Sequence, residues 1–263
     1  MGFEVARRVV ISLQRTMIFR LHHIGITVES LATAHGQLNL TYQETHVQRD
    51  IPTLACLDEV SIIRQPTFAI SLHARKESLD IELIEYPVVT PKRGALIPWE
   101  FAPEHSIEAV KATLRELSPK ARQGFSFGEL VSLTNGYRAL NAVVVPVEDI
   151  AAEHAFWGRL GFKSVHADEA LVVLRHDPCV PPAGPRYILL YAVPYAVPHF
   201  TDMAGISEIA LLCSSCASAY KRFPEATFRT SISEVRIAGR RLNIGYVRSP
   251  AGVLVELFAL VLS

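Results

Sequence analysis

Four ionisable side chains lie in segments of the sequence that are otherwise apolar and strand-like. They are His23 in residues 19–28, Glu82 in residues 79–86, Glu208 in residues 205–212 and Glu256 in residues 249–258. A carboxylate at an inward strand position is costly unless it is paired or bound to a metal ion. One imidazole and several carboxylates suit a divalent ion that keeps open positions, and Zn²⁺, Fe²⁺, Mn²⁺, Co²⁺ and Ni²⁺ are all candidates. The chemistry of these residues makes them candidates for a metal site.

Each of these residues also has an ordinary structural interpretation. His23 and its neighbour His22 can be packed or simply polar residues of an apolar strand, and Glu208 can face solvent. Because side chains alternate along a strand, His22 should point away from the face that carries His23. By the same alternation Glu85 should lie on the face opposite Glu82, where we expect it to be solvated.

Internal repetition organises the elements that must position these side chains. Three segments share one order of expected elements, which is an apolar strand, an amphipathic helix and further strands, a βαβββ unit. The segments are residues 19–90, 139–195 and 204–262. In the second segment apolar residues recur at helical spacing from Ile150 to Leu160, and Gly161 follows where a C-terminal cap glycine belongs.

Residues 91–138 are harder to assign. They contain a strand-like segment at 94–101, a helical segment at 106–117 and a short apolar run at 127–133. A half-sheet with one apolar face must pair with another to bury that face. We therefore interpret 91–138 as a degenerate fourth module that completes the first sheet, with Glu100 and Glu129 as its metal-capable residues.

The predicted fold class is α+β, with paired βαβββ modules that form two curled half-barrel sheets. The predicted domains are residues 1–138, in which 1–16 form a leader, and residues 139–263. Alignment of the repeats against one another matches His23 with Ala142 and Glu208, and it matches Glu82 with Leu189 and Glu256. The first and third modules thus keep metal-capable residues, and the second has lost both.

Three motifs resemble a known superfamily. Leu21–Leu31, LHHIGITVESL, is similar to the opening strand and turn of methylmalonyl-CoA epimerases and other glyoxalase-like proteins. Ile81–Glu85 is similar to the last strand of the same module. Ser249–Leu257, SPAGVLVEL, resembles the closing DP-x-G-x-x-x-EL signature and departs from it at Ser249. Together these motifs resemble the vicinal oxygen chelate superfamily, which includes glyoxalases, bleomycin-resistance proteins and extradiol dioxygenases.

The resemblance implies roles for individual residues. The second histidine of the opening pair, His23, and the first glutamate of the last strand, Glu82, occupy the ligand positions of the pattern. The bound ion would chelate two adjacent substrate oxygens and stabilise an enolate as a Lewis acid. A nearby glutamate would move the proton as general base, and Glu256 and Glu82 are the candidate catalytic residues.

The leading function is therefore a metal-dependent isomerase or lyase of glyoxalase or epimerase type that acts on a small oxygen-rich metabolite. The alternative is a non-catalytic binding or sequestration protein of bleomycin-resistance type. An extradiol-type dioxygenase is a weaker alternative, because those enzymes hold Fe²⁺ with two histidines and a glutamate from one module pair. Here the second pair offers only Glu208 and Glu256.

Composition narrows the possible partners and compartment. The 263 residues include 26 basic and 26 acidic ones, so no charge excess favours nucleic acid or a membrane surface. No apolar run approaches the ~20 residues that a membrane span needs. Four cysteines in a chain of this size do not make a disulfide framework. We expect a cytoplasmic protein with a small-molecule substrate or ligand, and a homodimer is compatible with the sequence.

Overall fold

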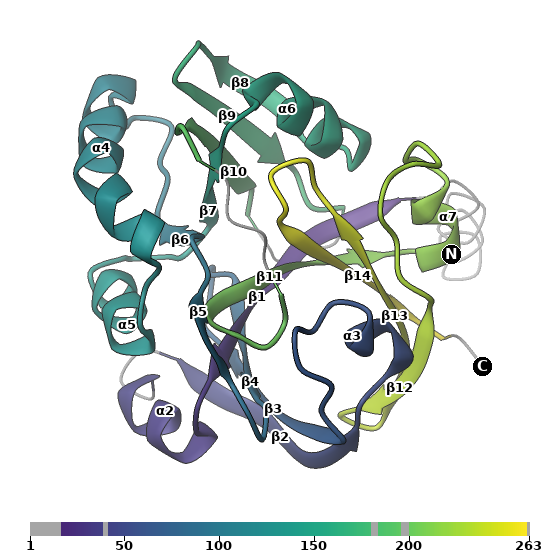
Figure 1. The fold of residues 1–263 in the computed structure, drawn as a ribbon. Coiled ribbons are helices and arrows are strands. Elements are labelled where there is room, and N and C mark those ends of the chain that lie inside the picture. The colour runs from purple at the N-terminus through teal and green to yellow at the C-terminus, as the bar shows by residue number, and fades with distance from the viewer. Residues whose placement is uncertain (1–16, 39–41, 180–183, 196–199, 262–263) are drawn as a thin grey trace, which may run out of the picture.

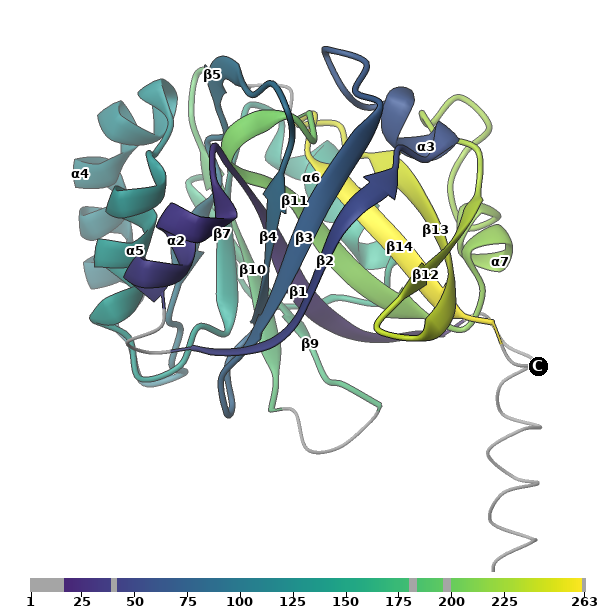
Figure 2. The same ribbon diagram turned by 90° about the horizontal axis from the view of Figure 1, so that it is seen from below.

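The structure is a computed structural model that describes residues 17–38, 42–179, 184–195 and 200–261. The expected leader, 1–16, lies outside these residues. The fold is mixed α+β, and the described strands form one sheet of nine strands and one of five (Figure 1). The larger sheet curls until it is nearly closed, and α2 (Leu31–Leu38), α4 (Ile107–Gln123) and α5 (Phe127–Asn135) lie together beside it (Figure 2). This arrangement confirms the predicted fold class.

The larger sheet is built from the first and third repeats. The first repeat contains β1 (Ile18–Val28), α2 (Leu31–Leu38), β2 (Gln43–Pro52), α3 (Ala55–Asp58), β3 (Thr67–Ala74) and β4 (Asp80–Glu85). The third contains β11 (Met203–Cys213), α7 (Cys216–Tyr220), β12 (Ser233–Ile237), β13 (Arg240–Arg248) and β14 (Leu254–Leu260). The strand order is β12-β13-β14-β11-β1-β4-β3-β2, and β5 (Thr90–Arg93) pairs with β11.

The second repeat forms the smaller sheet with a strand from the segment before it. This repeat contains β7 (Ala142–Val147), α6 (Ile150–Arg159), β8 (Lys163–Ala167), β9 (Leu171–His176) and β10 (Arg186–Ala192). The preceding segment contains β6 (Ile97–Trp99), α4 (Ile107–Gln123) and α5 (Phe127–Asn135). The strand order is β6-β7-β10-β9-β8, so the second repeat has the same internal order as the first.

The sheets do not follow the predicted division into 1–138 and 139–263. β1 pairs antiparallel with β11, so modules from both sides of that boundary share one sheet. Both strands have 11 residues and are almost wholly buried, whereas β6 has only 3 residues and pairs with the shorter β7. A three-residue strand cannot cover the edge of β1, and β11 can.

Residues 91–138 are therefore not a complete fourth module of the first sheet. They supply most of the short strand β5 to the larger sheet, the short strand β6 to the smaller sheet, and two helices, α4 and α5. Their two candidate ligands have structural partners instead. Glu129 closes a capping box with Ser126 at the start of α5 and pairs with Lys120. The carboxylate of Glu100 accepts a hydrogen bond from the backbone N–H of Arg138.

Local signals explain where several helices begin and end. The Asp149 side chain accepts a hydrogen bond from the backbone N–H of Ala152 at the start of α6, and Gly161 follows that helix with a φ of 95°. The Glu85 carboxylate accepts a hydrogen bond from the backbone N–H of Leu31 at the start of α2. Glu85 was expected to be solvated, and it instead holds the positive end of a helix.

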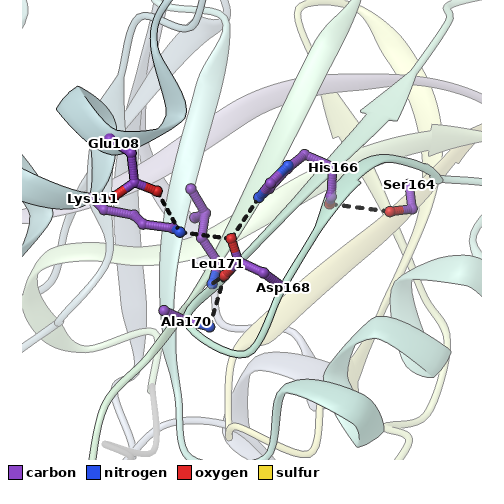
Figure 3. Close-up of polar contacts among 7 residues, drawn as sticks. All are labelled: Glu108, Lys111, Ser164, His166, Asp168, Ala170 and Leu171. Carbon is purple, nitrogen blue, oxygen red and sulfur yellow. Dashed lines mark hydrogen bonds and ion pairs between the residues drawn. The ribbon is translucent and has the colours of Figure 1, made fainter.

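A carboxylate at the β8–β9 turn fastens α4 to the smaller sheet (Figure 3). Asp168 Oδ2 lies 2.7 Å from Lys111 Nζ and 2.8 Å from His166 Nε2. Its other oxygen, Oδ1, accepts hydrogen bonds from the backbone N–H groups of Ala170 and Leu171. The hydrogen bond from Lys111 is the main reason that the pKa of Asp168 lies far below its usual value.

This contact should make stability depend on pH. A carboxyl whose folded pKa is depressed stabilises the fold above its unfolded pKa, and the stabilisation is lost as pH falls toward the folded pKa. We expect Asp168→Asn to lower the melting temperature by about 2 °C at pH 7, and this difference should shrink as pH falls below the usual pKa of an aspartate. Thermal unfolding followed by circular dichroism at several pH values measures this. Asp177→Asn, at an exposed pair with Arg175, is the matched control. An equal shift for Asp168→Asn at every pH would contradict the prediction.

Cys213 and Cys216 are buried free thiols, and their Sγ atoms approach backbone carbonyl oxygens of β13 and β14. Among the described residues, no helix is both long enough and apolar enough to cross a membrane.

Candidate metal centre

The structure brings the four predicted ligands together inside the curled sheet. His23 comes from β1, Glu82 from β4, Glu208 from β11 and Glu256 from β14, and each offers one ligand atom within 4.8 Å of the other three. His23 Nε2 is 2.9 Å from Glu82 Oε2 and 3.3 Å from Glu256 Oε2. None of the four residues is more than 7% exposed. One imidazole and three carboxylates thus share a site closed to solvent.

Strand register explains why these four side chains meet. In the parallel ladder of the first module, Gly25 lies opposite Glu82, two residues after His23. In the third module Ala210 lies opposite Glu256, again two residues after Glu208. The antiparallel β1–β11 pair sets Gly25 against Glu208 and His23 against Ala210. The two modules are therefore related by an approximate twofold axis that exchanges His23 with Glu208 and Glu82 with Glu256.

The second module has the same register without the ionisable groups. Val144 lies opposite Leu189, two residues after Ala142, in the ladder between β7 and β10. The alignment of the three repeats from sequence thus agrees with the strand register in every module. Ala142 and Leu189 are fully buried apolar residues, so this sheet carries core packing where the larger sheet carries its charged cluster.

Gly25 makes room for one of the carboxylates. A Cβ atom on Gly25 would collide with Glu208 Cγ and would lie 2.8 Å from Glu208 Oε1. The backbone of β1 at position 25 therefore lies so close to the Glu208 side chain that any residue other than glycine would collide with it. Packing against Glu208 explains why the HHIGITV segment has a glycine at position 25, which the sequence pattern alone did not explain.

The cluster contains three carboxyl groups and only one imidazole, so it holds more potential negative charge than positive charge. Burial raises the pKa of Glu208 well above its usual value, and the charges of Glu256 and Glu82 raise it further. Burial also raises the pKa of Glu256, against the opposing effect of its close contact with His23. Burial alone would lower the pKa of His23, but its close contacts with Glu256 and Glu82 reverse this and raise it well above its usual value. Without a cation the cluster therefore retains protons.

His22 holds the ring of His23, a role that alternation along the strand did not predict. The Nδ1 atoms of the two rings are 3.0 Å apart. Burial lowers the pKa of His22 well below its usual value, so the His22 ring is neutral and can accept a hydrogen bond from His23 Nδ1–H. That hydrogen bond leaves His23 Nε2 to face the carboxylates. A histidine ligand whose other nitrogen is fixed in this way has its tautomer and orientation set.

A short segment covers the cluster on its concave side. Cys56 and Leu57 of α3, together with Val60, pack in one apolar cluster with Tyr86, Tyr246 and Phe258 from the surrounding strands. Tyr246 lies opposite Glu256 in the β13–β14 ladder, and its hydroxyl lowers the pKa of Glu208 against the larger effect of burial.

Comparison with known proteins shows the fold. No protein-family model matches the chain, and no curated protein matches it either. Among solved structures, glyoxalase I from Zea mays is 13% identical, covers 93% of this chain and 92% of its own, and has a TM-score of 0.52. A mutant of glyoxalase I from Zea mays is 12% identical over 97% of this chain and 96% of its own, with a TM-score of 0.50. This chain thus has a glyoxalase-like fold. The sequence motifs that resemble the vicinal oxygen chelate superfamily predicted this fold.

Proposed function

We propose that the protein is a metal-dependent isomerase or lyase of glyoxalase or epimerase type, acting on a small oxygen-rich metabolite. In this proposal His23, Glu82, Glu208 and Glu256 hold one divalent metal ion. The observation that carries the proposal is the convergence of these four buried side chains, with ligand atoms within 4.8 Å of one another. The four come from four strands of two separate repeats, so general apolar packing does not account for their meeting.

The residues fit a divalent ion in charge and in unsatisfied polar atoms. His23 Nε2, Glu208 Oε2 and Glu256 Oε2 are buried and have no hydrogen bond of good geometry. Buried polar atoms without partners are rare, and a cation between them would satisfy all three. Three carboxylates in a buried site also repel one another unless protons or a cation compensate them. One nitrogen and up to three oxygens are suitable donors for Zn²⁺, Mn²⁺, Fe²⁺, Co²⁺ or Ni²⁺.

The chemistry that follows is proton movement beside a polarised substrate oxygen. When bound, a divalent ion supplies Lewis-acid stabilisation of negative charge on substrate oxygens. Glu256 and Glu82 are the residues we propose to move the proton. Glu256 Oε2 is buried and lies 3.3 Å from His23 Nε2, at a position from which this carboxylate could take a proton from a substrate carbon and return it. The apolar cover of Cys56 and Leu57 would exclude water while the proton is in transit.

Metal analysis tests the proposal. We expect protein purified without chelator to contain a first-row divalent metal, and we expect His23→Ala to lose one ion per chain while keeping its circular dichroism spectrum. The metal-loaded protein should also exchange the carbon-bound proton of a small α-hydroxyketone for deuterium in D₂O, followed by NMR. Metal without exchange across a panel of such compounds would favour a non-catalytic binding protein. An equal metal content in wild type and His23→Ala would refute the assignment of this centre.

A further inference from the structure

A second group of metal-capable side chains lies on the other face of the larger sheet. It consists of His35 on α2, Glu44 on β2 and His73 on β3. Leu72 lies opposite Glu82 in the β3–β4 ladder, so its side chain shares the face of the first centre. His73 is the next residue along β3 and faces the opposite side, beneath α2. The two groups are therefore separated by the sheet itself.

Close contacts already join the members of this second group. His35 Nδ1 is 2.8 Å from Glu44 Oε2, and His35 Nε2 is 2.9 Å from Ser71 Oγ. Ser71 Oγ is also 2.9 Å from His73 Nε2, and the two imidazole rings meet edge to face with centroids 5.0 Å apart. One ligand atom from each of His35, Glu44 and His73 lies within 4.8 Å of the others. Two imidazoles and a carboxylate thus converge on one hydroxyl.

Hydrogen bonding alone leaves this group incompletely satisfied. His73 is fully buried, and its Nδ1 has no hydrogen-bond partner. Burial, with the nearby His35, lowers the pKa of His73 to about 4, so its ring is neutral at pH 7. A neutral imidazole is the form that binds metal ions. His73 is therefore a fully buried imidazole whose hydrogen-bonding capacity the protein does not satisfy.

We propose that His35, Glu44 and His73 form a second divalent-metal site, suited to Zn²⁺ and distinct from the centre on the concave face. Two histidines and one glutamate are a common ligand set for zinc, with a fourth position left for water. Ligand atoms at ~2.1 Å from a tetrahedral ion lie roughly 3.4 Å apart, so these side chains need only small rotations to close on an ion. The Glu44 side chain is 37% exposed and the His35 side chain 20%, which gives an ion a route from solvent.

The position of the site indicates what a bound ion would do. β2 is the edge strand of the larger sheet, and α2 lies over its neighbours. An ion held by His35, Glu44 and His73 would tie α2 to both β2 and β3, and its binding would therefore be coupled to the stability of the fold. The site is separate from the chemistry proposed for the concave centre.

Zinc titration of chelator-treated protein tests this site without any assay of activity. A chromophoric chelator in competition counts the ions bound per chain. We expect Glu44→Gln to bind one ion fewer than wild type. His35→Asn should do the same, and it serves as a second variant if Glu44→Gln folds poorly. Ser71→Ala removes the bridging hydroxyl but no ligand, so it should keep the full number. His46→Gln is the matched control, because His46 lies on β2 but contacts Gln48 and the backbone N–H of Ala238.

A variant of the first centre separates the two proposals. Glu256→Gln should still bind one zinc ion at the second site, and Glu256→Gln combined with Glu44→Gln should bind none. Co²⁺ bound to Glu256→Gln should give visible absorption bands of a four-coordinate site, and Glu44→Gln should remove them. The second site is overturned if Glu256→Gln binds no zinc, or if Glu44→Gln and His35→Asn bind as many ions as wild type. If Glu44→Gln binds no zinc at all and Glu256→Gln binds as much as wild type, the second site is supported and the first centre is not.

Discussion

Glu256→Gln should abolish function at the concave centre without harming the fold. Glutamine keeps the shape of the side chain but is a poor metal ligand and cannot take up a proton. Loss of a group that merely hydrogen-bonds to a ligand weakens metal affinity 10–100-fold, so loss of a ligand should weaken it by more than about 100-fold. Loss of the proposed general base should slow hydrogen–deuterium exchange by about 10²–10⁴-fold.

Glu256→Gln should not lower the unfolding temperature of the metal-free protein and should leave it unchanged or raise it. Glu256 is buried beside Glu208 and Glu82, and the charge of Glu256 helps to raise the pKa of Glu208. Removal of that charge relieves repulsion in metal-free protein, so chelator-treated Glu256→Gln should unfold at the same temperature as wild type or higher. Glu234→Gln, at an exposed pair with Arg241, is the control for the substitution itself. Unchanged metal affinity and exchange in Glu256→Gln would assign the proposed chemistry elsewhere.

Gly25→Ala should disrupt the same centre through packing alone. The added Cβ would collide with Glu208 Cγ, so the Glu208 side chain must leave its place among the four ligands. We expect metal affinity to fall about 100-fold, as for loss of a group that holds a ligand in place. Overpacking a buried position should also lower the free energy of unfolding by about 1–3 kcal/mol. Metal titration and chemical denaturation of the same preparation measure both effects.

A glycine elsewhere in the fold provides the control. Gly158 lies in α6, and a Cβ there would meet nothing within 4 Å. Gly158→Ala should therefore leave metal affinity unchanged and raise the free energy of unfolding by about 0.5–1 kcal/mol, through the better helix propensity of alanine. If Gly25→Ala binds metal as tightly as Gly158→Ala does, then Glu208 is not a ligand.

The candidate residues of the concave centre could be predicted from the sequence for a physical reason. Charged groups rarely occupy inward positions of apolar strands, so His23, Glu82 and Glu256 were conspicuous within their segments. The repeated modules then supplied the correspondence of His23 with Glu208. Strand register within a module is a local property, because the first and last strands of each unit pair with each other. The α+β class followed from the same repeated order of strand, helix and strands.

Contacts between modules and between side chains were decided by the tertiary structure. Three repeats can share sheets in more than one way, and the pairing of β1 with β11 depends on strand length and on which edges remain open. Alternation places His22 on the opposite face, but the register of β1 against β11 shifts between Leu21 and His23, and the Nδ1 atoms of His22 and His23 lie 3.0 Å apart. His35, Glu44 and His73 belong to three elements with no shared pattern, and only the packing of α2 over the sheet brings them together. Alternation and repetition act along one strand or one module, whereas these contacts depend on how separate elements pack in space.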